Sequence, residues 1–194
     1  MNRRTLIGAG ATLAMFAAAS TASGAVSELP RRNRVRVAFM LGDGANVIDT
    51  AGPWEVFQDT AVPAGSHNHP FELYTVGRDR STVRMTGGLR VVPDFTPQTA
   101  PQPQVIVVPA QRSDPRLLAW LRSAGAGADV VVSVCTGAFQ LARAGLLAGV
   151  PATTHHEYWD SFAEQFPDIE LRRGVRFVDS GRIATSGGLT SGID

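Results

Sequence analysis

The chain has one cysteine, Cys135, and its position in the sequence suggests chemistry. An apolar, β-branched run at residues 130–134 leads to Cys135, and Thr136 and Gly137 lead on into a helix-like stretch at 138–147. A strand that turns into a helix at a nucleophilic residue has the layout of a nucleophile elbow. The free N–H groups and positive dipole end of the next helix would point at the sulfur, which predicts a thiolate rather than a thiol. We therefore expect a reactive cysteine; the alternative is a buried structural one.

Asp49 is the candidate acid or base to accompany this thiol. It follows an apolar pair shortly after the first predicted strand, and Cys135 directly follows a later strand. In a parallel α/β sheet the carboxyl ends of the strands form the active-site edge, so both residues are expected there. Backbone N–H groups around Thr136 and Gly137 predict an anion-binding nest, with a second contribution from the loop at Ala110. The alternative for Asp49 is a turn aspartate.

The histidines give weaker signals. His67 and His69 lie in a polar segment at 64–70 with no cysteine or acidic cluster nearby, so a surface loop is favoured over a metal site. His155 follows a short predicted strand at 152–154 and would have to approach Cys135 through the fold. A structural role is its default interpretation. We expect neither a metal nor another cofactor.

The composition excludes several function classes. The chain has 194 residues, enough for one domain with a hydrophobic core, and a formal net charge of +1. So balanced a charge predicts no nucleic-acid partner and no acidic membrane surface. All 18 basic residues are arginine, which excludes a Schiff-base lysine and a phosphate-loop lysine.

The first 25 residues have the pattern of a signal peptide. Arg3 and Arg4 form a basic start, residues 8–19 are small and apolar, and residues 23–25 offer a cleavage site. The arginine pair favours a twin-arginine signal; the alternatives are a Sec signal and an uncleaved anchor. We expect an exported, periplasmic or secreted protein without a stable membrane anchor after cleavage. Residues 26–34 form a linker.

Strand and helix patterns alternate along the rest of the chain. Strands are predicted at 35–41, 71–76, 105–108 and 130–134, and hairpins at 83–92 and 175–185. Helices are predicted within 49–57, with Pro53 in the first turn, after Asp114-Pro115, at 138–147 and at 156–166. This alternation predicts a mostly parallel sheet with helices on both faces. Residues 187–194 look like a turn opening a helix that does not follow, so we expect a chain truncated at its C-terminus; the alternative is a last sheet face without a cover.

Several separated motifs resemble the DJ-1/PfpI superfamily, a class I glutamine amidotransferase-like group. They are residues 48–57, 134–138, 144–149, 152–155 and 187–194. The pattern is most similar to the isonitrile hydratase branch and to the amidotransferase-like domain of AraC-type regulators, and it runs from residue 35 to the end. The resemblance implies a flavodoxin-like three-layer sandwich, a homodimer, and a cysteine on a strained elbow.

The resemblance also implies roles for individual residues. In the isonitrile hydratase pattern Cys135 is the nucleophile and Asp49 the acid or base. Thr136 stands where peptidase-like members carry a histidine, which argues against a Cys-His peptidase. His155 matches a histidine that lies near the cysteine in DJ-1-like members. Two features depart from the pattern: residues 109–111 read Pro-Ala-Gln where many relatives carry a glycine pair, and the C-terminal helix is missing.

The expected function is that of a cysteine-dependent hydro-lyase. It would hydrate a small isonitrile to an N-substituted formamide through a covalent thioimidate on Cys135. The alternative is a non-catalytic DJ-1/PfpI domain that binds a small ligand or senses oxidation, related to AraC-type regulators but without their DNA-binding part. Either way the expected partners are a small molecule and a second copy of the chain.

Overall fold

The computed structural model describes residues 34–62 and 69–193. The predicted signal peptide, nearly all of the predicted linker and His67 lie outside these residues. Export, signal cleavage and the homodimer therefore stay predictions. Within the described ranges, no helix combines the length and the apolar character needed to cross a membrane.

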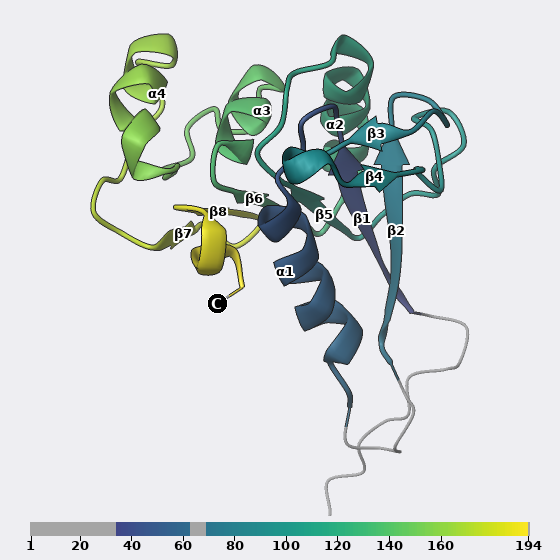
Figure 1. The fold of residues 1–194 in the computed structure, drawn as a ribbon. Helices are drawn as coiled ribbons and strands as arrows, with labels where there is room; N and C mark the ends of the chain where they lie inside the picture. Colours follow the sequence, from purple (N-terminus) through teal and green to yellow (C-terminus); the bar gives the residue numbers. More distant parts are fainter. Residues whose placement is uncertain (1–33, 63–68, 194) are drawn as a thin grey trace, which may run out of the picture.

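One sheet organises the described residues (Figure 1). Its parallel strands are β1 Val35–Leu41, β2 Phe71–Gly77, β5 Val105–Val108, β6 Val130–Val134 and β8 Ile183–Ser186. β7 Phe177–Asp179 pairs antiparallel with β8 at one edge, and the strand order is β2-β1-β5-β6-β8-β7. A separate hairpin pairs β3 Val83–Arg84 with β4 Arg90–Val91. This is the flavodoxin-like strand order. From β1 the chain adds β2 on one side and β5 on the other, and ligands of such sheets bind at this switch point, outside the carboxyl ends of the strands.

Helices cover both faces of the sheet. α1 Val47–Asp59 packs on one face, where Trp54 and Phe57 contact Val37, Phe39 and Val107. α2 Pro115–Gly127 and α3 Gly137–Arg143 pack on the other face. The fold is therefore the predicted three-layer α/β sandwich.

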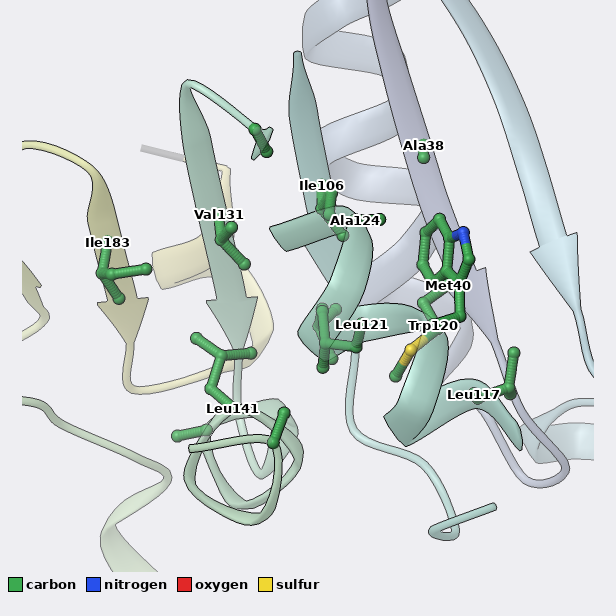
Figure 2. Packing of buried hydrophobic residues seen from close by; sticks show 14 of the residues in the cluster. Ala38, Met40, Ile106, Leu117, Trp120, Leu121, Ala124, Val131, Leu141 and Ile183 are labelled. Carbon is green, nitrogen blue, oxygen red and sulfur yellow. The ribbon is translucent and has the colours of Figure 1, made fainter. Parts of the chain in front are cut away.

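The larger part of the core lies under α2 and α3 (Figure 2). Trp120 and Leu121 of α2 are buried against Met40 of β1 and Ile106 of β5. Each such side chain contributes about 1.5–3 kcal/mol by leaving water. The Asp114 carboxylate caps α2 by accepting two backbone N–H groups of its first turn. These contacts hold α2 against the strands β1 and β5, whose carboxyl ends carry the candidate site.

The remaining elements complete the C-terminal half. η2 His156–Tyr158 leads into α4 Trp159–Gln165, as the helical pattern at 156–166 predicted. Besides η2, the short 3₁₀ turns of the described residues are η1 Thr86–Gly88 in the β3–β4 hairpin and η3 Leu189–Gly192 at the end of the described chain. η3 packs against α1, so the last motif lies beside the residues that follow β1.

Three local predictions were wrong. α1 begins at Val47 because Asn46 caps it, so Pro53 lies inside the helix rather than in its first turn. The helix after Cys135 ends at Arg143, before a turn in which Gly145 has φ +77°. Residues 152–154 form only a single bridge, between Ala152 and Leu171, instead of a strand.

Candidate active site

Cys135 occupies a strained turn between β6 and α3. Its φ is +58°, a left-handed conformation uncommon for a residue with a side chain. Two hydrogen bonds hold its backbone there: its N–H donates to the Ser186 carbonyl at 3.2 Å, and the Thr154 hydroxyl donates to its carbonyl at 3.0 Å. Strain held in place by surrounding contacts is typical of functional positions. The predicted elbow is thus present.

Two glycines make room for this turn. A Cβ on Gly137 would collide with the carbonyl oxygen of Val108 on the neighbouring strand. A Cβ on Gly188 would lie 2.6 Å from the Cβ and 3.0 Å from the sulfur of Cys135, and Gly188 has φ +99°. Gly188 therefore lies directly against the thiol, and a larger side chain in its place would displace the thiol.

Asp49 lies in the first turn of α1 and is fully buried. Its Oδ2 accepts a hydrogen bond from the Ala110 N–H at 3.2 Å, while its buried Oδ1 has no partner of normal geometry among the described residues. Burial raises the pKa of the Asp49 carboxyl, although the N–H groups of Ala110 and Leu189 and the nearby His155 and Cys135 each lower it. Since Asp49 and Cys135 each affect the pKa of the other, the structure brings together the two side chains that were predicted to act together.

The thiol is not the predicted thiolate. Burial, and next the negative charge of Asp49, raise the pKa of Cys135 from its ordinary value of 9.0 to about 11. The backbone N–H and hydroxyl of Thr136 lower this pKa without offsetting the increase. The expectation from the helix dipole was wrong because α3 has only seven residues and the sulfur lies away from water beside a carboxyl group. At neutral pH the sulfur of Cys135 therefore carries its proton.

The other predicted site residues lie around this pair. Thr136 contacts the sulfur, and Gly137 begins α3. The Ala110 N–H is already bonded to Asp49, so in this structure it holds the carboxyl in place. His155 is close enough to Asp49 to affect its pKa, and its Nδ1 accepts from the Glu157 N–H at 3.4 Å. The roles of these residues in catalysis stay predictions.

An open cavity of about 750 Å³ adjoins the elbow. Its lining includes Thr136, which follows the cysteine, and Ala110, which bonds Asp49. The cavity lies at the carboxyl ends of β1 and β5, where the sheet order reverses. It is large enough for a small organic molecule.

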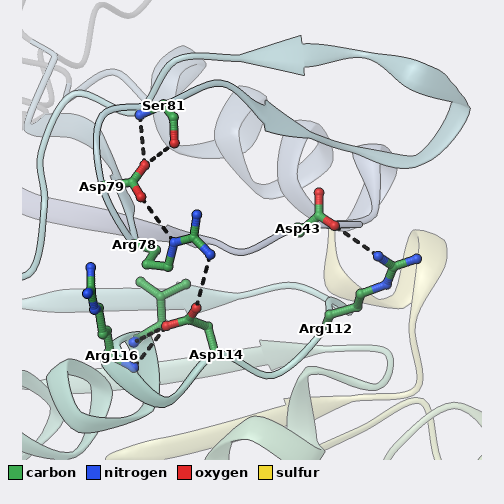
Figure 3. A network of polar contacts seen from close by, with 8 residues as sticks. Asp43, Arg78, Asp79, Ser81, Arg112, Asp114 and Arg116 are labelled. Carbon is green, nitrogen blue, oxygen red and sulfur yellow. Dashed lines mark hydrogen bonds and ion pairs between the residues drawn. The ribbon is translucent and has the colours of Figure 1, made fainter.

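A second cavity, of about 340 Å³, lies beside the first. Asp43 and Arg112 line both cavities and form an ion pair at 2.9 Å (Figure 3). Around the second cavity, Arg78 pairs with Asp79 at 3.1 Å and approaches Asp114 at 3.9 Å. Its charges are thus paired with one another. In the part of the chain that the structure describes, no group of three or more histidine, cysteine or acidic residues is placed to hold a metal ion.

Sequence reasoning missed the residues from other parts of the chain that fix the backbone of Cys135 and contact the two site side chains. Ser186 and Thr154 fix the backbone of Cys135, Gly188 packs on its sulfur, and the Leu189 N–H reaches Asp49. The Gly-Gly-Leu run was visible as a motif, but its contact with the thiol depends on β8 lying next to β6. Non-consecutive strand pairing of this kind has no local signal.

Comparison with known proteins identifies the family. The model of the DJ-1/PfpI family matches residues 35–194. The chain belongs to the DJ-1/PfpI family. It is 32% identical over 166 residues to an isonitrile hydratase of Pseudomonas putida, covering 82% of this chain and 68% of that protein. A ThiJ/PfpI family protein of Pseudomonas syringae has the same fold, with a TM-score of 0.73 and 28% identity over 87% of this chain and 68% of the other.

Transcriptional regulators are also relatives of this DJ-1/PfpI chain. It is 28% identical over 162 residues to the HTH-type transcriptional regulator GbdR of Pseudomonas aeruginosa. This match covers 81% of this chain but only 44% of the regulator. The family therefore includes both an enzyme and regulators at similar distance from this sequence. Family membership alone does not choose between catalysis and ligand binding.

Proposed function

We propose that this DJ-1/PfpI protein is a cysteine-dependent hydro-lyase that hydrates a small isonitrile to an N-substituted formamide. The observation that carries this proposal is the buried carboxyl of Asp49 beside Cys135, whose backbone forms the strained elbow next to an open cavity. A nucleophile with a carboxyl group beside it is a catalytic pairing. The similarity to an isonitrile hydratase supports the choice of substrate class.

In the first step the sulfur of Cys135 bonds to the terminal isonitrile carbon. Since the thiol is protonated at rest, its proton has to leave as the bond forms, and the Asp49 carboxyl is the neighbouring group that can receive it. Asp49 passes that proton to the same carbon. The product is a thioimidate, R–N=CH–S, with the sulfur that of Cys135.

In the second step water adds to the thioimidate carbon. Asp49 removes a proton from the water as it attacks, and the substrate nitrogen gains one. The carbon–sulfur bond then breaks, the sulfur regains a proton, and R–NH–CHO leaves. One water is consumed and no oxidant or reductant is needed, so the two side chains are a sufficient catalytic set.

The raised thiol pKa weighs against the redox-sensing alternative. Cysteines that register peroxide react as low-pKa, accessible thiolates, whereas burial and Asp49 keep Cys135 protonated. A non-catalytic ligand-binding domain is the second candidate, and the similarity to the regulator GbdR favours it. In that case the cavity would bind the same small molecule without turnover.

The test is direct assay of formamide production. The purified protein is incubated with tert-butyl isocyanide, and the N-substituted formamide is measured by NMR. We expect turnover by the parent protein and none by Cys135→Ala or Asp49→Asn. Asp168→Asn, which removes an exposed carboxyl outside the site, should retain full activity.

Two results would overturn the proposal. Formamide production by Cys135→Ala would exclude the covalent route. Absence of turnover of neutral and carboxylate-bearing isonitriles alike in the folded parent protein, with circular dichroism showing intact structure, would leave the ligand-binding function in its place.

A further inference from the structure

The side-chain acceptors that line the cavity beside the elbow are already occupied. Asn46 Oδ1 accepts the Ile48 N–H at 3.1 Å, and Thr86 Oγ1 accepts the Val47 N–H at 3.1 Å. Gln111 Oε1 accepts the Gly42 N–H. The remaining carboxylate in the lining, that of Asp43, accepts from Arg112.

The two arginines of the lining, Arg84 and Arg112, have spare donors. Arg112 uses one of its five N–H donors on Asp43, and the described residues offer Arg84 neither an ion-pair nor a side-chain hydrogen-bond partner. The lining therefore offers hydrogen-bond donors and an unbalanced positive charge.

The β3–β4 hairpin adds to this imbalance. Arg84 pairs in register with Arg90 on the antiparallel strand, so the two side chains project from the same face of the hairpin. Like charges directly opposite one another are destabilising, and no carboxylate among the described residues is paired with either of them. An anion held between the hairpin and Arg112 would offset this repulsion.

We propose that the substrate or ligand of this cavity carries a carboxylate, which Arg84 binds with help from Arg112. This inference rests on the proposed function for the reacting end of the molecule. Thr136 lines the same cavity, so a molecule whose carboxylate lies at Arg84 extends toward Cys135. The favoured substrate is thus a small isocyano carboxylate rather than a neutral alkyl isonitrile.

Binding to an inactive protein tests the inference apart from catalysis. The probes are N-formylglycine, the formamide of isocyanoacetate, and its uncharged methyl ester, each titrated into Cys135→Ala by calorimetry. We expect the acid to bind at least about tenfold more tightly than the ester, as suits one charge-assisted contact. Arg84→Gln should abolish that preference and Arg84→Lys should restore part of it. Arg116→Gln, an equal charge change on exposed α2 surface, should leave it intact.

Turnover of isocyanoacetate and methyl isocyanoacetate by the parent protein then separates the two proposals. A lower KM for the acid, lost in Arg84→Gln with kcat retained, supports both. Preferential binding of the acid without turnover of either compound overturns the hydro-lyase function and supports the carboxylate site. Equal binding of acid and ester, binding of neither, or a preference unchanged in Arg84→Gln overturns the carboxylate site.

Discussion

Replacing Asp49 with asparagine should make the thiol of Cys135 more acidic while removing activity. The negative charge of Asp49 is the second-largest cause of the raised thiol pKa, after burial. Asparagine keeps the size of the side chain and its ability to accept from the Ala110 N–H. Burial remains, so we expect the pKa of Cys135 in Asp49→Asn to lie below about 11 but above the ordinary 9.0.

The size of the effect on reactivity follows from the thiolate population. With a pKa of about 11, about one thiol in a thousand is ionised at about pH 8. A decrease of about one unit raises this fraction roughly tenfold, and the lower basicity of the thiolate takes back about a factor of three. Alkylation of Asp49→Asn should therefore be about three- to fourfold faster than alkylation of the parent protein.

Because the chain contains one cysteine, intact mass spectrometry reads this reaction directly. The rate of alkylation by iodoacetamide is measured against pH for the parent protein, Asp49→Asn and the exposed control Asp168→Asn. The control should follow the parent curve. An apparent pKa in Asp49→Asn that equals or exceeds the parent value would refute the assigned coupling between the two side chains. A pKa near 9 for Cys135 in the parent protein would refute the reasoning as well, because burial would then not raise the pKa of the thiol.

Three further predictions concern stability. Cys135 and Tyr74, with pKa values raised to about 11 and about 12, favour the folded state while they are protonated. Stability that is present below about pH 9 should therefore be lost as the pH rises through about 11, by roughly 3 kcal/mol for the thiol. In urea titrations the free energy of unfolding of Cys135→Ala should fall less steeply with rising pH than that of the parent protein. Gly188→Ala places a Cβ 2.6 Å from the Cβ of Cys135 and should lower the free energy of unfolding by about 2 kcal/mol or more. Gly181→Ala, at φ +81° with open space around it, should lower it only by the backbone strain of about 1 kcal/mol. If thermal unfolding shows Gly181→Ala to be the less stable variant, the close packing of Gly188 on Cys135 is contradicted. Arg182→Met removes bonds to three carbonyls at the end of α2 and should lower the urea midpoint by an amount equivalent to about 2 kcal/mol; an unchanged midpoint would show that water replaces those bonds.

The sheet and its order of elements were predictable because their signals are local. Apolar β-branched runs such as Val105–Val108 carry the pattern of a buried strand, and Asp114-Pro115 carries that of a helix start. Helix ends were less predictable because they depend on competing caps. Asn46 starts α1 earlier than Pro53 suggested, and the turn at Gly145 stops α3 early.

The closeness of Cys135 and Asp49 was predictable, but the charge state of the thiol was not. Cys135 and Asp49 each follow a strand, and the geometry of parallel sheets places such residues at one edge. The pKa of the thiol depends instead on how much water the fold removes from the sulfur and on how close the Asp49 carboxyl comes. Contacts between segments far apart in the sequence decide both, such as that of Gly188 with Cys135 and that of Ala110 with Asp49. The dipole of α3 would lower the pKa of the thiol, but the loss of water around the sulfur raises it by more, so the pKa shift of Cys135 is upward. In this chain the elbow therefore holds a protonated thiol, and under the proposed function the Asp49 carboxyl is the group that would take its proton.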